Sequence, residues 1–273
     1  MQAFSQWTPP AGTLGKIVGE ALLRSSVLEG RLDELERLCA VTPAGPSLRA
    51  ALVQQTVSLL TEVKRRSPSK GAIAEGLDAV TQAQAYAEGG AAGVSILTEP
   101  AHFGGSTEDL LDVRRRVALP ALKKDFHVAP IQLLEARALG ASAALLIARA
   151  LSPERLAEMM RVGTDLGLEL LVEVRDEAEL ERALAEGATM VGVNNRNLET
   201  LVIDPETSIR LVPLIPPAVI AIAESGVRTR ADVERYAAAG ADAVLVGSSL
   251  SSAADPVAAT RALAGVPRVS RAS

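Results

Sequence analysis

The sequence predicts an α/β protein, a closed (β/α)8 barrel with a helical extension before its first strand. From residue 57 to residue 265, eight short apolar runs alternate with amphipathic helical segments, as in a barrel of eight βα units. A Gly-Ala turn or a close variant ends four of the helical segments, beginning at Gly90, Gly140, Gly187 and Gly240. Their spacing of about 50 residues equals two βα units, so four such quarters make one barrel.

An open, doubly wound sheet is the alternative fold. Such a sheet usually carries a nucleotide-binding loop after an early strand, and the sequence contains neither G-x-G-x-x-G nor G-x-x-x-x-G-K-[ST]. Hydrophobic residues make up 48% of the 273 residues and aromatic residues only 2%, so the core must consist mainly of Ala, Leu and Val. This composition suits an α/β protein.

The helical extension is predicted over residues 14–55. Apolar side chains recur at helical spacing from Leu14 to Leu22 and again from Leu28 to Leu38. Two prolines and a glycine within residues 42–46 end this pattern, and Ser47 is a predicted N-cap for a further helix over residues 48–55. We therefore expect a single domain, residues 1–273, that combines this extension with a barrel over residues 57–265.

The eight strands and the helices between them can be placed in order. Strands are predicted at residues 58–64, 92–97, 120–124, 143–147, 169–173, 190–194, 219–223 and 243–246. Helices are predicted at residues 79–88, 107–117, 131–139, 153–166, 176–186, 230–239 and 256–263. In such a barrel the active site lies at the C-terminal ends of the strands, so functional side chains are expected there.

Composition excludes several classes of function. The net charge of −5 and the scarcity of aromatic residues argue against nucleic-acid binding. No apolar run reaches membrane-spanning length and no secretory signal is visible, so a cytoplasmic location is expected. Cys39 is the only cysteine, which excludes an intramolecular disulfide and a Cys-based zinc site. His102 and His127 stand without acid or Cys at ligand spacing, so no metal site is expected.

Charged side chains follow several predicted strands. Glu62 and Lys64 are two residues apart at the end of the first strand and therefore share one face. The ends of later strands carry Lys124, Glu173, Asn194 and Glu224. Burying so many charges around one mouth is unfavourable unless they pair or bind a ligand. Charges of both signs converging from different strands therefore predict an active site.

Loops rich in Gly and Ser suggest an anionic ligand. A polar loop, Ser67-Pro68-Ser69-Lys70-Gly71, follows the first strand, and Gly-Ser turns follow the last two strands. Glycines let a phosphate approach the backbone, serines donate hydrogen bonds, and a short helix beginning at Ser248 would direct N–H groups at the anion. Gly226, Gly247 and Ser248 are the predicted phosphate-binding residues of a small phosphorylated substrate.

Six motifs together resemble the indole-3-glycerol-phosphate synthase family. They are Glu62-Val63-Lys64 with Ser67 to Gly71, Leu97-Thr98-Glu99 with Phe103 to Ser106, Lys124-Asp125-Phe126, Leu171 to Val174, Asn194 to Leu198, and Glu224-Ser225-Gly226. The resemblance covers residues 14–265, in that family's order. It implies a TIM barrel and a cofactor-free carboxy-lyase of tryptophan biosynthesis. The substrate would be 1-(2-carboxyphenylamino)-1-deoxyribulose 5-phosphate, converted by ring closure, decarboxylation and dehydration to indole-3-glycerol phosphate.

The same resemblance implies roles for individual residues. Lys124 would be the general acid of ring closure, Glu173 would transfer protons in the dehydration, and Lys64 would bind the substrate and assist. Glu62 and Asn194 would orient these groups, with Glu224 nearby. The implied substrate-binding residues are Ser67, Phe103, Phe126, Leu145, Arg196, Leu201 and Ser225. A Lys among cations or in an apolar pocket has a lowered pKa and a buried Glu a raised one, which suits proton transfer near neutral pH.

Two other functions stay open at this point. One is a different phosphate-binding barrel, such as a phosphoribosylanthranilate isomerase-like enzyme, and the other is a non-catalytic barrel. Such an isomerase would use a Cys and an Asp as its acid and base, but the only cysteine, Cys39, lies in the extension. The intact set of Lys64, Lys124 and Glu173 argues against a non-catalytic barrel.

The sequence departs from the family's usual pattern at Thr61, Arg175 and residues 127–130. None of these positions is one to which the resemblance assigns a chemical role. Other enzymes of the tryptophan pathway are candidate partners.

Overall fold

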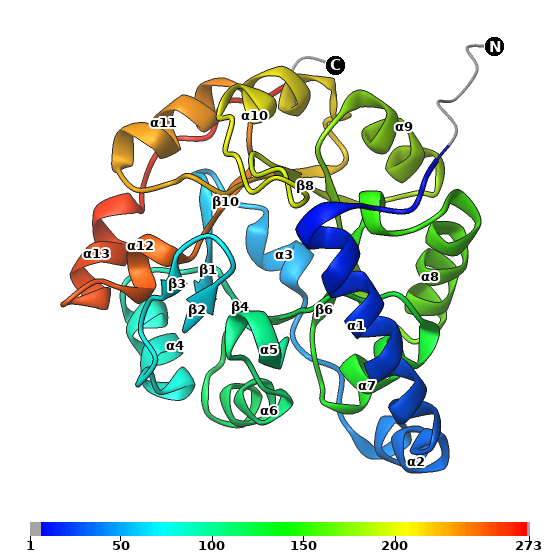
Figure 1. Ribbon diagram of the computed structural model, residues 1–273. Helices are drawn as coiled ribbons and strands as arrows, with labels where there is room; N and C mark the ends of the chain where they lie inside the picture. The colour runs from blue at the N-terminus through cyan, green and yellow to red at the C-terminus, as the bar shows by residue number, and fades with distance from the viewer. Residues whose placement is uncertain (1–6, 272–273) are drawn as a thin grey trace.

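The computed structural model describes residues 7–271, which form a closed barrel of parallel strands surrounded by helices (Figure 1). The barrel strands are β1 (Ser58–Val63), β4 (Gly93–Leu97), β5 (Ala121–Lys124), β6 (Ala143–Ile147), β7 (Glu169–Val174), β8 (Met190–Asn194), β9 (Ile220–Glu224) and β10 (Ala243–Val246). The last strand pairs with the first, Ser58 opposite Ala243, and this pairing closes the barrel. The predicted fold class is confirmed, and the alternative of an open sheet is wrong.

The helices around the barrel begin and end within one residue of their predicted positions. They are α4 (Ala79–Glu88), α6 (Thr107–Arg116), α7 (Pro130–Ala138), α8 (Pro153–Asp165), α9 (Glu177–Ala185), α11 (Arg230–Ala238) and α13 (Pro256–Leu263). Six of them start at an N-cap whose side chain accepts a backbone N–H, namely Asp78, Ser106, Ser152, Asp176, Thr229 and Asp255. The four Gly residues of the repeat take positive φ angles between 76° and 97°, the left-handed turn that ends a helix.

Several short elements in the connecting loops were not predicted. They are β2 (Arg66–Ser67), β3 (Gly71–Ala72), α5 (Pro100–Phe103), η1 (Ala148–Ala150), α10 (Glu206–Leu211) and η2 (Val212–Leu214). Each is too short to show a hydrophobic period. A further short helix, α12 (Ser248–Ser251), begins at the residue from which the sequence predicts one.

The barrel core is built from small and medium aliphatic side chains. Every residue of β1, β4, β6, β8, β9 and β10 is buried, because the strands face the barrel interior on one side and helices on the other. Burying one Val or Leu side chain stabilises a fold by about 1.5–3 kcal/mol, so the large number of buried aliphatic side chains offsets the scarcity of aromatic ones. No helix within residues 7–271 is long and apolar enough to cross a membrane.

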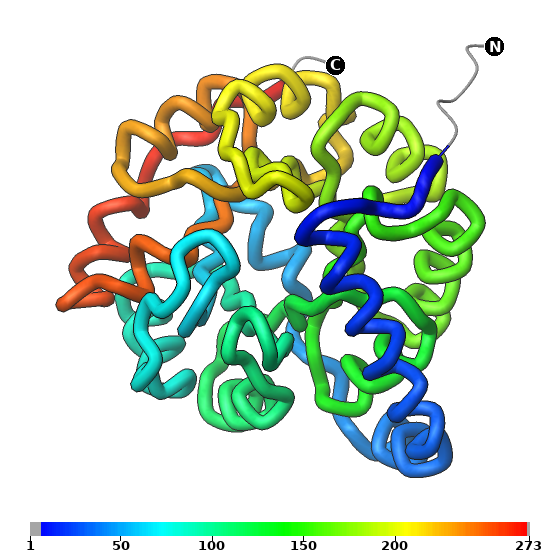
Figure 2. The backbone as a smooth tube through the Cα atoms, viewed as in Figure 1, coloured from blue at the N-terminus to red at the C-terminus, as the bar shows by residue number. Residues whose placement is uncertain are grey.

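The N-terminal extension contains α1 (Gly12–Glu29), α2 (Leu32–Val41) and α3 (Leu48–Leu52). The backbone trace shows α1 passing over the β6 side of the barrel and leading to α2, which packs beside α7 (Figure 2). Ser47 caps α3 as predicted, although α3 ends at Leu52, three residues before its predicted end. Leu14 and Ile17 on α1 are fully buried, so this extension shares the core of the barrel.

Candidate active site

A cavity of about 510 Å³ opens at the C-terminal ends of the barrel strands. Every residue predicted for the site lines this cavity: Glu62, Lys64, Ser67, Phe103, Lys124, Phe126, Leu145, Glu173, Asn194, Arg196, Leu201, Glu224, Ser225, Gly226, Gly247 and Ser248. The closed barrel brings them together although they span almost 190 positions of the chain, because all parallel strands point their carboxyl ends to one side.

Lys124 lies at the centre of a buried polar chain. Its Nζ donates to Glu224 Oε2 at 3.1 Å and lies 3.4 Å from Glu173 Oε2. Asn194 Nδ2 donates to the other carboxylate oxygen of Glu173 at 2.9 Å. Both carboxylates are almost fully buried, and β5, β7, β8 and β9 each contribute one member. The ammonium is therefore held between two carboxylates and faces the cavity.

A second ion pair joins Lys64 to Glu62 at the end of β1. Glu62 is buried, and the backbone at this strand end is fixed from outside the barrel. The hydroxyls of Tyr86 and Ser251 both donate to the Glu62 carbonyl, at 3.2 and 3.0 Å, and the Lys64 N–H donates to Ser251 Oγ at 3.2 Å. These contacts tie the end of β1 to α4 and α12, so the backbone that carries the Lys64 side chain is held in place.

The charge states around Lys124 differ from the expectation drawn from the sequence. Burial lowers the pKa of Lys124, but the charges of Glu224, Glu173 and Glu62 outweigh it and raise the pKa above its ordinary value. The expected lowering was wrong because the neighbours of Lys124 are carboxylates, not cations. Burial raises the pKa of Glu224 to about 7, opposed by Lys124 and supported by the charge of Glu173. Lys124 thus keeps its proton at neutral pH while Glu224 titrates there.

The loop after β8 folds back on itself and holds Arg196. The guanidinium donates to the Leu201 carbonyl at 2.9 Å, and the Arg196 N–H donates to Asn194 Oδ1 at 2.9 Å. Neighbouring Asn195 is fully buried and ties the loop to the next one, because its amide donates to the Ser225 carbonyl at 3.0 Å. Leu201 and Ser225 both take left-handed backbone conformations, with φ of 66° and 67°.

One wall of the cavity is apolar. The rings of Phe103 and Phe126 lie with their centroids 6.1 Å apart, and Leu145 from β6 lies in the same lining. Leu14 and Ile17 of α1 also line the cavity. Their position at the cavity could not be predicted from the sequence, because an amphipathic helix shows which side chains it buries but not which element they face. The wall suits a planar aromatic group.

The opposite side of the cavity suits an anion. Gly226, with φ of 94°, and Gly247 leave the backbone accessible, and Ser248 begins α12. Lys70 and Arg228 also line the cavity and were missed, because lone cations in loops carry no signal of their own. Burial and the nearby charges of Arg228, Arg196 and Lys64 lower the pKa of Lys70. Such a concentration of like charge favours binding of a dianion.

Gly247 also has a packing role. A side chain there would overlap Oε1 of Glu62 and would come within 3.2 Å of Lys64 Nζ. The absence of a side chain at Gly247 thus leaves room for the Glu62–Lys64 ion pair at the end of β1.

Within residues 7–271, the acid and imidazole side chains of one group could each offer one ligand atom, and these atoms lie within 4.8 Å of one another: Glu20, Glu99 and His102. The Glu99 oxygens accept the backbone N–H groups of residues 101–103 as well as the Arg24 guanidinium. Those oxygens are occupied by donors, so the group is a hydrogen-bonded cluster. The other histidine, His127, is buried against the Leu145 carbonyl, and burial together with the charge of Lys123 lowers its pKa to about 3.

The fold and the site define a class of protein, a phosphate-binding (β/α)8-barrel enzyme. Solved structures of the same fold include 3-hexulose-6-phosphate synthase from Salmonella typhimurium, with a TM-score of 0.62 and 14% identity over 76% of this chain and 96% of that one. Thiamine phosphate pyrophosphorylase from Pyrococcus furiosus gives a TM-score of 0.58 and 18% identity over 80% of this chain and 96% of that one. At these identities the likeness shows the fold alone.

Similarity in sequence identifies the family, which similarity in fold does not. A family model described as indole-3-glycerol phosphate synthase matches residues 16–263. Curated relatives of that name include one from Parafrankia sp. (strain EAN1pec), 51% identical over 84% of this chain and 85% of the relative. Another, from Streptomyces griseus, is 49% identical over 84% of this chain and 85% of the relative. The chain belongs to the indole-3-glycerol phosphate synthase family.

The activity is therefore that of a decarboxylating carbon–carbon lyase of tryptophan biosynthesis. It closes the ring of 1-(2-carboxyphenylamino)-1-deoxyribulose 5-phosphate and releases carbon dioxide and water, which gives indole-3-glycerol phosphate. The isomerase-like alternative is not supported, since Cys39 lies on α2 and is not among the residues that line the cavity.

Proposed function

We propose that Lys124 is the general acid of the ring closure. The proposal rests on the position of its ammonium, which lines the cavity 3.1 Å from Glu224 and 3.4 Å from Glu173. As the carboxyl-bearing aromatic carbon bonds to the ribulose carbonyl carbon, negative charge develops on the carbonyl oxygen. An ammonium that keeps its proton at neutral pH stabilises this oxygen and then protonates it. The carboxylate leaves as carbon dioxide, and its bonding electrons restore the aromatic ring.

Glu173 transfers protons in the dehydration that follows. The new hydroxyl must leave as water, and a proton must leave the neighbouring carbon to complete the indole. Glu173 is buried between Lys124 and Asn194, and Asn194 directs one of its oxygens while the other faces the ammonium. Lys64, held by Glu62, binds the substrate from the opposite strand end and assists the departure of the hydroxyl.

The substrate lies across the cavity with its two ends in different surroundings. Gly226, Gly247 and Ser248 hold the phosphate, with Lys70 and Arg228 contributing positive charge. The aromatic ring packs against Phe103, Phe126 and Leu145. The polar groups of the substrate between its phosphate and its aromatic ring contact Arg196, Ser67 and Ser225. Leu201 lines the cavity beside these groups. The phosphate does not react, so its binding energy anchors the substrate and positions the reacting carbons.

We further propose which part of the chain forms the functional unit, and in which compartment and with which partners the reaction occurs. The extension, residues 14–55, and the barrel, residues 57–265, act as one functional unit, since α1 supplies part of the cavity wall. No cofactor is required, because every proton-transfer role falls to a side chain. The acidic composition and the single cysteine suit the cytoplasm. Other enzymes of the tryptophan pathway are the proposed partners.

The experiment is a direct turnover assay. The purified protein is incubated with the carboxyphenylamino-deoxyribulose phosphate while indole fluorescence and released carbon dioxide are recorded. We expect equimolar formation of both products. Carbon dioxide release without indole fluorescence, or no reaction in a folded protein, would contradict the proposal.

A further inference from the structure

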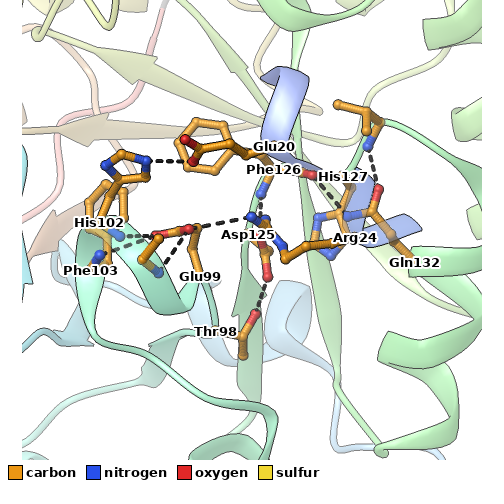
Figure 3. A network of polar contacts seen from close by, with 12 residues as sticks. Glu20, Arg24, Thr98, Glu99, His102, Phe103, Asp125, Phe126, His127 and Gln132 are labelled. Atoms are coloured by element: carbon orange, nitrogen blue, oxygen red, sulfur yellow. Dashed lines mark hydrogen bonds and ion pairs between the residues drawn. The ribbon is translucent and has the colours of Figure 1, made fainter. Parts of the chain in front are cut away.

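We propose that Arg24 is a positioning residue that sets the aromatic half of the substrate site from outside the cavity. Arg24 lies on α1, and its guanidinium donates to two different loops (Figure 3). One branch, Nη2, donates to Asp125 Oδ1 at 2.9 Å, and the other, Nη1, donates to Glu99 Oε1 at 3.3 Å. The loop after β4 and the loop after β5 therefore share one cation supplied by the N-terminal extension. This inference rests on the proposed binding of the aromatic ring.

Through Glu99, Arg24 reaches Phe103. Glu99 is the N-cap of α5, and its carboxylate accepts the backbone N–H of residues 101, 102 and 103. Phe103 is the last residue of this one-turn helix and lines the cavity. A second contact between α1 and α5 supports the first, since His102 Nε2 lies 2.6 Å from Glu20 Oε2. The orientation of α5, and with it the Phe103 ring, depends on α1.

Through Asp125, Arg24 reaches Phe126 and the residue beside the proposed general acid. Asp125 directly follows Lys124, and its Oδ1 also accepts the Phe126 N–H at 2.8 Å. Its Oδ2 accepts the Thr98 hydroxyl at 2.6 Å, which joins the same two loops a second time. The backbone that carries Phe126 is thus fixed by a carboxylate that Arg24 holds in place.

Charge and burial explain why one arginine has this influence. Glu99 is fully buried and Asp125 is 7% exposed, whereas the Arg24 side chain keeps 29% of its surface exposed. Burial raises the pKa of Asp125, but the charges of Lys123 and Arg24 and the Thr98 hydroxyl together hold it below its ordinary range. Without Arg24, the carboxylates of Glu99 and Asp125 lose their shared counter-charge, and only the contacts through Thr98 still join the two loops. Backbone N–H groups of residues 101–103 still donate to Glu99, and Thr98, Lys123 and the Phe126 N–H still contact Asp125, so the barrel remains folded.

The two halves of the substrate site respond differently to this contact. The aromatic half belongs to β4 and β5, whose loops Arg24 joins, while the phosphate half belongs to β9 and β10 on another arc of the barrel. Loss of Arg24 therefore weakens the grip on the aromatic ring and leaves the phosphate site intact. A general loss of stability would affect both.

The test compares Arg24→Gln with wild type in two binding measurements. Dissociation constants are measured for indole-3-glycerol phosphate and for inorganic phosphate by calorimetry, and kcat and KM are measured for the substrate. We expect roughly tenfold weaker binding of indole-3-glycerol phosphate, unchanged phosphate binding, and a lower kcat, because a small displacement of the reacting ring slows chemistry. Arg31→Gln is the matched control, since Arg31 is also an arginine of the extension but its guanidinium pairs with the exposed side chain of Glu34. It should leave all four constants unchanged.

Arg24→Lys is the second variant, and it is measured in the same way if Arg24→Gln does not fold. A lysine retains the charge but cannot hold two carboxylates with one planar group, so it should show the same selective loss to a smaller degree. Unchanged indole-3-glycerol phosphate binding in a folded Arg24 variant would overturn the inference. Equal losses for both ligands would overturn it as well, because they would indicate general loosening. Wild-type turnover tests the proposed function separately, so failure of one does not resemble failure of the other.

Discussion

Lys124 and Glu224 meet across the mouth of the barrel, with Nζ 3.1 Å from Oε2, although 100 residues separate them in the chain. They end strands β5 and β9, which are not neighbours in the barrel. Only closure of the whole sheet brings these two ends together. Because burial raises the pKa of Glu224 to about 7, the charge that holds Lys124 is itself sensitive to pH near neutrality.

We predict that kcat/KM of the wild type falls as pH decreases through about 7. Protonation of Glu224 removes a charge that orients the Lys124 ammonium, so fewer molecules hold the productive geometry. Glu224→Gln should lower kcat/KM about tenfold to a hundredfold at pH 8 and make it insensitive to pH between about 6 and 8. The measurement is a pH profile of kcat/KM. An acid limb that persists at the same pH in Glu224→Gln would assign it to another group.

A charge substitution at Ser248 tests the phosphate site. Ser248→Asp places a carboxylate at the start of α12, where it repels a dianion, while Ser248→Asn has the same shape without the charge. We expect Ser248→Asp to lose most of the wild-type preference for indole-3-glycerol phosphate over dephosphorylated indole-3-glycerol, and Ser248→Asn to keep most of it. Dissociation constants for both compounds give the result. Equal preference in the two variants would place the phosphate elsewhere. Gly247 is less suitable, since a side chain there would also disturb Glu62.

Activity should be independent of divalent metal ions. Each proposed proton transfer falls to a Lys or Glu side chain, and the oxygens of Glu99 in the Glu20, Glu99 and His102 group already accept hydrogen bonds. Dialysis against EDTA should leave kcat and KM unchanged. Loss of activity that returns with a divalent ion would show that a metal takes part.

Glu179 provides a prediction about stability and pH. It is buried on α9, where burial and the charge of Asp176 raise its pKa to about 7. The folded protein therefore retains this proton while the unfolded chain loses it near pH 4.5, so stability from this group falls as pH rises from about 5 to 8. Glu179→Gln should remove that loss and gain up to about 3 kcal/mol relative to wild type over the same range. Urea unfolding at several pH values measures it; a constant difference would mean that Glu179 ionises normally.

The fold could be predicted from the sequence because its signals are local. Asp78 and Ser106 mark helix starts through their own side chains, and Gly90 and Gly140 mark helix ends through a backbone conformation that few residues adopt. Strand runs between them follow from their apolar composition. These signals can be recognised without knowing which elements pack against one another.

The rest of the site depends on contacts between distant segments. Nothing in the sequence of α1 shows that Leu14 faces the cavity or that Arg24 reaches the loops after β4 and β5. Lys70 and Arg228 are single loop cations, and only folding gathers them at one mouth. The predicted direction of the Lys124 pKa shift was wrong for the same reason. The direction depends on which charges lie within a few ångströms of the ammonium, and the sequence does not show this.

The most direct test of the central claim is the single-turnover rate of Lys124→Ala, measured by indole fluorescence with enzyme in excess over substrate. The substitution removes the proposed proton donor and no packing group, so we predict a rate about 10²- to 10⁴-fold below wild type, with indole-3-glycerol phosphate binding changed far less. The binding measurement confirms that the cavity is intact. A rate near that of wild type in this folded variant would contradict the role of Lys124 as the general acid.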